Sequence, residues 1–151
     1  MSDVSSTAWK PFEIIPYGVV LHVPTDWEAL PPVPANGPEI LRATGGAGRM
    51  LIVFKMPAGG LTAAQVADKA QEKLAAHGFA DFTRTETRFA GRSGVALDFV
   101  TRDGDGKVAR RTREYFAVRG NAAFVLGMGS ASWAEHLPLI EQIAERFELA
   151  D

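Results

Sequence analysis

The sequence predicts an α+β domain in which two amphipathic helices cover an antiparallel β-sheet. The first observation is a series of short segments in which apolar and polar residues alternate, as in strands. The second is that short turns join many of these segments, which favours antiparallel pairing. The third is the helical spacing of apolar residues in two segments, 61–79 and 138–147. This order of strands, helix, strands and helix indicates an α+β sandwich.

Length and composition fit one globular domain. The chain has 151 residues, of which 46% are apolar and 23% are charged. Its net charge of −2 provides no general attraction for nucleic acid or an anionic membrane. The chain has no cysteine, which excludes disulfides, thiolate metal sites and a cysteine nucleophile.

Residues 1–10 are expected to form a disordered leader, and residues 11–151 a single domain. The first ten residues lack the basic start and apolar run of a secretory signal. No apolar run approaches the roughly 20 residues that a membrane-spanning helix needs. We therefore expect a cytoplasmic protein.

The first third of the chain is expected to contain four strands and a proline-rich loop. The strands are predicted at residues 12–15, 18–23, 39–43 and 49–56. Val19, Leu21 and Val23 share one face of the second strand. Five of the nine prolines lie in residues 24–38, which favours a surface loop over a helix or a central strand. Residues 49–56 carry apolar side chains on both faces, which predicts a central strand covered on both sides.

The helix in residues 61–79 has well-marked ends. Thr62 is suited to be its N-cap, and Gln65 completes a capping box. Gly78 is expected to end the helix, with Phe79 folding back on Leu74 as in a Schellman motif. The apolar stripe consists of Ala63, Val66, Ala67, Ala70 and Leu74. Because this stripe is narrow and rich in alanine, we expect the helix to lie close against a sheet and to bury Leu74.

An edge strand, a long hairpin and a last strand are expected next. Residues 82–90 alternate threonine with charged residues, which is typical of an edge strand. Residues 95–102 and 107–119 form the hairpin about a turn at residues 103–106. Pairing Arg102 with Lys107 would place Asp98 opposite Arg111 as an ion pair. The last strand is predicted at residues 122–128.

The final helix has two candidate starts. Ser132 and Glu135 offer a capping box. Pro138 is poorly tolerated inside a helix, so the helix is expected to begin there and to run to about Phe147.

Several segments have the order of motifs found in one known superfamily. They are YGVVLHVPTDW at residues 17–27, RMLIVFKM at 49–56 leading into LTAAQ at 61–65, and Gly91-x-x-Gly94-x-Ala96. The long hairpin and a closing helix that ends in Arg146-Phe147 follow. In this order the chain, from about Tyr17 to Leu149, resembles the PsbP-like superfamily, which includes the Mog-type Ran-binding import factors and has a bacterial branch.

This resemblance implies a central antiparallel sheet with helices on both faces, an α/β/α sandwich. It also implies binding without catalysis, because known members are mostly adaptors, lipoproteins and photosystem subunits without active sites. Members of one bacterial branch are cytoplasmic chaperones that cradle the apolar helices of type VI secretion effectors. The size of this chain and its lack of a secretory signal suit that branch.

Residues with catalytic or metal-binding potential form no complete motif. His22, His77 and His136 lack partners at ligand spacing. The DGDGK turn lacks the third acidic ligand and closing glutamate of a calcium loop. Ser132 and His136 are one helical turn apart without a third member of a triad. We therefore expect no enzyme activity, no metal and no cofactor.

The GMGSAS segment at residues 127–132 follows a strand but is not a dinucleotide fingerprint. It lacks the third glycine and the βαβ unit that such a site needs. We expect its glycines to let a helix or another backbone approach the strand.

The hairpin carries the one local excess of positive charge. Its cations are Arg102, Lys107, Arg110, Arg111, Arg113 and Arg119. A basic hairpin could bind nucleic acid or an acidic partner. Successive residues of a strand point to opposite faces, and Asp98 and Glu114 offset part of the charge. A solvated strand pair is therefore favoured, and nucleic-acid binding is not expected.

Another protein is the expected partner, and a homodimer remains open. We expect the contact on the exposed part of the proline-rich loop and on the sheet face that it borders. The residues are Leu30, Pro31, Pro32, Val33, Pro34 and Ala35. Prolines reduce the entropy lost when such a loop docks. Trp27 is expected to anchor the loop to the domain.

The alternative is a module that binds a small molecule or lipid. It would use an apolar groove beside the sheet, with Trp27, Phe54 or Met56 as lining. A bound small ligand would favour this alternative, and a copurifying protein would favour the first.

Overall fold

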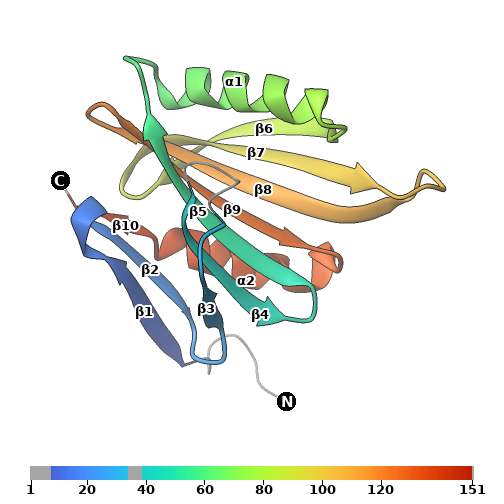
Figure 1. Ribbon diagram of the computed structural model, residues 1–151, viewed down its shortest axis with the longest axis horizontal. Helices are drawn as coiled ribbons and strands as arrows, with labels where there is room; N and C mark the ends of the chain where they lie inside the picture. The colour runs from blue at the N-terminus through green and yellow to red at the C-terminus, as the bar shows by residue number, and fades with distance from the viewer. Residues whose placement is uncertain (1–7, 34–38, 151) are drawn as a thin grey trace.

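The computed structural model describes residues 8–33 and 39–150 of the chain. The described residues form strands, two α-helices and one 3₁₀ helix (Figure 1). In chain order they are β1 (Trp9–Ile14), η2 (Ile15–Tyr17), β2 (Val19–Pro24), β3 (Glu28–Leu30), β4 (Glu39–Gly46), β5 (Arg49–Pro57), α1 (Ala63–Ala76), β6 (Ala80–Phe89), β7 (Arg92–Arg102), β8 (Val108–Arg119), β9 (Ala122–Ser130), α2 (Trp133–Glu145) and β10 (Glu148–Leu149).

Seven strands form the large sheet, in the order β3-β4-β5-β9-β8-β7-β6. Every neighbouring pair in it is antiparallel. The predicted α+β class with antiparallel pairing is therefore confirmed. β6, the predicted edge strand, lies at one edge of this sheet.

A second, three-stranded sheet has the order β1-β2-β10 and was not predicted. β1 begins at Trp9, so it includes two residues that were assigned to the leader. β10 follows α2, so β9 is not the last strand. Arg119 stabilises this sheet by donating to the carbonyls of Tyr17 (2.9 Å) and Ala150 (2.6 Å).

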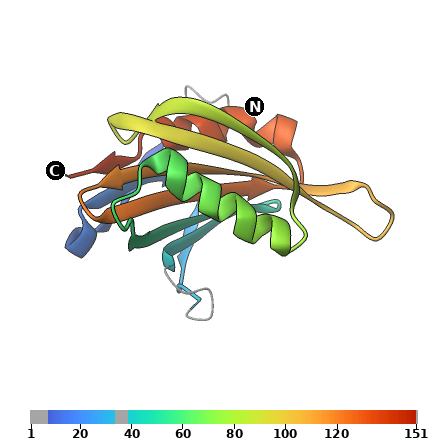
Figure 2. The ribbon, with the colours of Figure 1, turned by 90° about the horizontal axis from the view of Figure 1, so that it is seen from above.

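The buried residues divide into two clusters because side chains alternate along the strands. Along β9, Phe124, Leu126 and Met128 belong to the first cluster, and Ala123 and Val125 to the second. The buried residues of α2 and β2 lie in the first cluster, and those of α1 lie in the second. Figure 2 shows the two helices well separated from each other.

The ends of α1 are as predicted. Thr62 accepts a hydrogen bond from the Gln65 amide, and the Gln65 side chain accepts one from the Thr62 amide. Gly78 has a φ of +91°. The amides of Phe79 and Gly78 donate to the carbonyls of Leu74 (3.1 Å) and Ala75 (3.2 Å), which completes the Schellman motif.

The burial of Leu74 was predicted wrongly. Val66 and Ala67 are the buried residues of α1, whereas Leu74 is only partly buried. α1 packs chiefly on β7 and β8, so the outer edge of its apolar stripe is left in contact with solvent.

The hairpin register differs from the prediction by two residues. Asp98 lies opposite Arg113, not Arg111. A bulge between Thr101 and Arg102 shifts the pairing, and the turn holds Lys107 against Asp103, whose carboxylate accepts the Lys107 and Asp105 amides. Arg113 and Asp98 form a two-pronged ion pair of 2.7 and 2.9 Å.

α2 begins at Trp133, and the predicted start at Pro138 is wrong. The helix includes Pro138 in its second turn, where the side chain is exposed. The Ser132 side chain makes no capping bond, and the His136 amide donates to the Ser132 carbonyl (3.1 Å). Backbone bonds and the packing of Ile143 and Ala144 therefore outweigh the cost of one proline.

Removing Leu97 should cost much more stability than removing Leu74. Leu97 is fully buried beneath α1, so Leu97→Ala should lower the unfolding free energy by about 2–5 kcal/mol. Leu74→Ala should cost about half as much or less, because part of the side chain already contacts water. Urea denaturation of both variants tests this. Equal losses would place Leu74 in the core.

Candidate functional site

The proline loop, residues 30–35, begins at the edge of the large sheet. Leu30 ends β3 and is half-buried, whereas Pro31, Pro32 and Val33 are exposed. Of the predicted contact residues, Pro34 and Ala35 lie outside the described residues. β3 is a three-residue edge strand within a segment that was predicted to be loop throughout.

An ion pair at the start of β4 fastens this loop. Glu39 has a fully buried side chain and accepts from Arg42 Nε (2.6 Å) and Nη2 (3.0 Å). This bond raises the pKa of Arg42. The Val33 amide also donates to Glu39 Oε1 (3.0 Å). The loop is therefore tied to the sheet beside β5.

The anchoring role predicted for Trp27 agrees with its burial. Its side chain is 2% exposed and belongs to the first cluster. A Cβ at Gly45 would overlap the indole ring, and the Arg49 guanidinium lies over the ring at 5.4 Å. Trp27 therefore lines no groove on the α1 side of the sheet.

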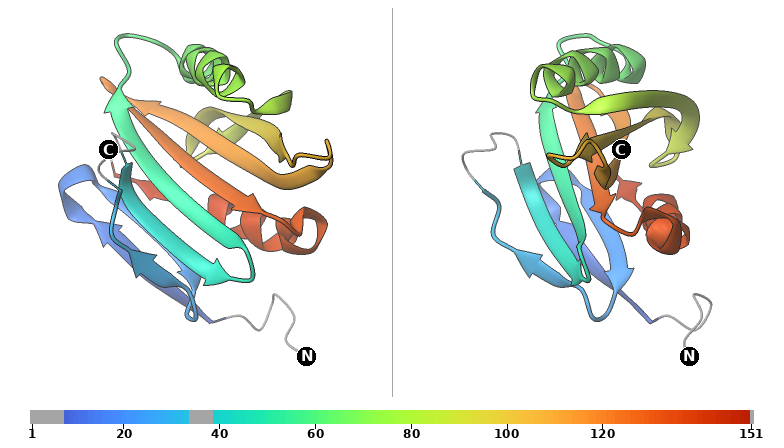
Figure 3. Two further views of the ribbon diagram at one scale, coloured as in Figure 1. Left: turned by 45° about the vertical axis from the view of Figure 1, so that its right-hand side comes forward. Right: turned by 90° about the vertical axis from the view of Figure 1, so that its right-hand side faces the viewer.

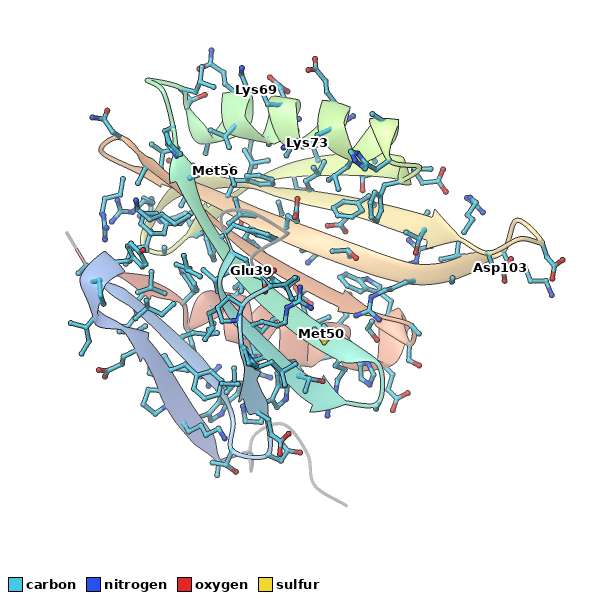
Figure 4. All side chains as sticks on the ribbon, in the orientation of Figure 1. Glu39, Met50, Met56, Lys69, Lys73 and Asp103 are labelled. Carbon is cyan, nitrogen blue, oxygen red and sulfur yellow. The ribbon has the colours of Figure 1, made fainter. Side chains whose placement is uncertain are left out.

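β5 carries a row of partly exposed apolar side chains on the α1 side. We call it the β5 row: Met50, Ile52, Phe54 and Met56. Figure 4 labels its two ends, Met50 and Met56. Leu51 and Val53, which point the other way, are fully buried. Figure 3 shows α1 over the β6-β7-β8 end of the sheet, away from β4. The prediction that this strand is covered on both faces is therefore wrong for one face.

Two hollows adjoin between the β5 row and α1, and together we call them the groove. Their volumes are about 190 and 200 Å³. Both are lined by Phe54, Leu74 and Glu114. The first is also lined by Met56, Ala70, Lys73, Phe116 and Val125, and the second by Met50, Ile52, Phe79, Phe99, Arg110, Thr112, Gly127 and Gly129.

Two glycines of β9, Gly127 and Gly129, line the groove. A Cβ at Gly129 would lie 2.9 Å from Arg110 Nε and 3.0 Å from Thr112 Oγ1. A Cβ at Gly127 would lie 3.6 Å from the Glu114 side chain. Gly129 thus admits side chains from β8, whereas the sequence predicted the approach of a helix or a backbone.

Glu114 is the one carboxylate in the lining of the two hollows. Burial among apolar side chains raises its pKa from 4.5 to about 7. Burial also lowers the pKa of Arg110, whose Nη1 donates to the Gly48 carbonyl (2.9 Å). From the sequence, Glu114 was expected only to offset part of the positive charge of the hairpin. The register of β8 with β9 is needed to place Glu114 against Gly127.

Several cations of the hairpin are held by local contacts. Arg113 pairs with Asp98 and lies over the ring of Trp133 at 5.6 Å. Arg102 pairs with Asp81, and Arg119 binds backbone carbonyls. These contacts support the solvated strand pair over a nucleic-acid site.

Ser130 and His136 form a pair that the sequence did not predict. Ser130 Oγ lies 2.5 Å from His136 Nδ1 and accepts from the Ser132 amide (2.9 Å). Ser130 is 1% exposed, so its hydroxyl stabilises the start of α2 and is out of reach of a substrate. Among residues 8–33 and 39–150, no group of three or more histidine or acidic side chains is placed to hold a metal ion.

No protein-family model and no curated protein matches the sequence. Solved structures do match the fold. Cyanobacterial PsbP (CyanoP) from Synechocystis sp. PCC 6803 superposes with a TM-score of 0.77 at 14% identity, over 99% of this chain and 97% of that one. The chain has a PsbP- and Mog-like fold.

Two further structures support this PsbP- and Mog-like fold. The Saccharomyces cerevisiae Ran-binding protein Mog1p has a TM-score of 0.62 at 11% identity, over 97% of both chains. LpqN of Mycobacterium tuberculosis, involved in cell envelope biogenesis, has a TM-score of 0.54 at 20% identity, over 97% of this chain and 92% of that one. The predicted resemblance is therefore confirmed at the level of fold.

Within the described ranges, neither helix has the length and apolar character needed to cross a membrane.

The stability of the domain should respond to the ionisation of Glu114. Its pKa is raised on folding, so its favourable contribution is present below pH 4.5 and is lost as the pH rises through about 7. Glu114→Gln should therefore be more stable than wild type at pH 8, by about 1–3 kcal/mol, and similar to it near pH 4. Urea denaturation across this range measures the difference.

Glu86→Gln, on the exposed edge strand β6, controls for the loss of one carboxylate. If the two variants differ from wild type by the same amount at every pH, the pKa of Glu114 is not raised.

Proposed function

We propose that this chain is a non-catalytic protein-binding domain. Its fold is shared with the Saccharomyces cerevisiae Ran-binding protein Mog1p, which supports a binding role. Ser130 and His136 resemble part of a catalytic pair. The Ser130 hydroxyl, however, contacts His136 and accepts from the Ser132 amide at the start of α2, which is a structural role. These observations favour binding over chemistry.

The β5 row is the observation that carries this proposal. Four neighbouring apolar side chains on one strand remain partly exposed, and apolar surface gathered in this way marks an interaction site. The proline loop begins beside this row, since its Val33 amide is bonded to Glu39, which pairs with Phe54 across the ladder. We place the partner across the loop residues 30–35 and the β5 row.

The proposal includes three expectations from the sequence. The first is the layering, with α1 on one face of the large sheet and α2 on the other, which the two clusters support. The second is a cytoplasmic location. The third is membership of the bacterial branch, in which a secretion effector with apolar helices would be the partner.

A module for a small molecule or lipid is the second candidate. The volume and apolar lining of the groove favour it, and Phe54 and Met56 are among the lining residues. Trp27 is not, because it is buried in the first cluster. Native mass spectrometry of the chain purified from its own host separates the candidates: a copurifying protein supports the first and a retained small ligand the second.

Replacing Val33 should weaken partner binding. Val33 and Val108 are both exposed valines, with exposed fractions of 37% and 41%. Val108, however, lies at the start of β8, in the β7–β8 hairpin. Once mass spectrometry has identified the partner, Val33→Asp should raise its dissociation constant about tenfold or more, because a charge would be buried in the contact. Val108→Asp should leave it unchanged.

Hydrogen exchange on the same complex locates the interface. Binding should slow exchange at the amides of Leu30 and Val33 and in β4. Equal affinity of both aspartate variants, with unchanged exchange in this region, would place the interface elsewhere.

A further inference from the structure

Glu114 lies where the two hollows of the groove meet. It lines both, together with Phe54 and Leu74, whereas Lys73 lines only the first and Arg110 only the second. The groove therefore has an apolar half on each side of a single carboxylate. Each half also has one cation in its lining, Lys73 in the first and Arg110 in the second.

The Glu114 carboxylate has no hydrogen-bond or ion-pair partner among the described residues. Arg110, four residues away on β8, donates instead to the Gly48 carbonyl. Lys73 is an exposed side chain on α1. β5 and β9 contribute no titratable side chain to the lining, so Lys73 and Arg110 are the charged groups that face Glu114. A carboxylate in apolar surroundings without a partner favours an occupant that supplies a cation.

The position of Glu114 limits the form of that occupant. A simple amphiphile, such as a fatty amine, carries its charge at one end. A carboxylate between two apolar hollows instead matches a cation that has apolar groups on both sides. One segment of a polypeptide supplies this arrangement when a lysine or arginine lies between two large apolar residues on the same face.

We propose that the groove binds a segment of a partner protein in which a lysine or arginine lies between two large apolar side chains, and that Glu114 pairs with this cation. The inference rests on the proposed protein-binding function and names the partner's chemistry at that site. One apolar side chain enters each hollow, and the cation lies over the Gly127 position, where no side chain intervenes. Glu114 is thus a specificity-determining residue.

The pairing makes the affinity depend on pH. The lysine of the partner stays protonated up to about pH 10. Glu114 becomes ionised as the pH rises through about 7, in the presence of Lys73 and Arg110. The affinity for the segment should therefore rise between pH 6 and pH 8. Glu114→Gln should remove this rise.

Three synthetic peptides test the proposal by fluorescence anisotropy. Each is an acetylated, labelled helix-forming peptide with leucine, a variable residue and leucine on one face. The variable residue is lysine, norleucine or glutamate. At pH 8 the wild-type chain should bind the lysine peptide about tenfold or more tightly than the glutamate peptide. Glu114→Gln should reduce this ratio to about twofold or less, and Glu86→Gln should keep it.

Other outcomes overturn the proposal. Equal binding of the lysine and glutamate peptides would show that Glu114 does not select a cation, and no binding of any peptide would exclude a polypeptide segment. Binding of dodecylamine alone, lost in Glu114→Gln, would assign the groove to a small amphiphile. The protein-binding function fails separately, if native mass spectrometry of the chain from its own host shows a retained small ligand and no copurifying protein.

Discussion

The width of a helix limits how much of the large sheet α1 can cover. An α-helix with its side chains is about 10–12 Å across, and neighbouring strands lie about 4.8 Å apart, so one helix covers two or three strands. α1 packs on β7 and β8 and touches β6. The sheet has seven strands, so the α1 side of β5 is left without a helix. The β5 row, the groove and the proposed contact all follow from this shortfall.

Features that depend on local sequence were predicted well. The capping box at Thr62 and the Schellman motif at Gly78 involve residues close in the chain, so the spacing of those residues was sufficient to predict both motifs. The alternation on β2 likewise predicted its buried face. The start of α2 was missed because tertiary packing compensated for Pro138, a long-range effect that spacing does not report.

The candidate site depended on long-range geometry, and the sequence predicted only parts of it. Apolar residues on both faces of residues 49–56 indicated a central strand, but alternation does not say what covers each face. Glu114 lies against Gly127 only because β8 and β9 pair in one register. In the β7–β8 hairpin, the bulge between Thr101 and Arg102 made the register inferred from the turn incorrect. Phe54 and Met56 line the groove as expected. Trp27 was also expected to line a groove, but it is buried in the first cluster.

Thiol labelling of Ile52→Cys tests most directly whether the uncovered face of β5 is the binding surface. The chain has no cysteine of its own, so a single introduced thiol reports one position. In the free protein this thiol should react readily with a maleimide, whereas that of Val53→Cys, on the fully buried face, should not. A saturating lysine peptide should slow labelling of Ile52→Cys and leave that of Val108→Cys unchanged. Two results would contradict the account. One is an Ile52→Cys thiol that is as unreactive in the free protein as that of Val53→Cys. The other is an Ile52→Cys thiol that the bound peptide does not protect from labelling.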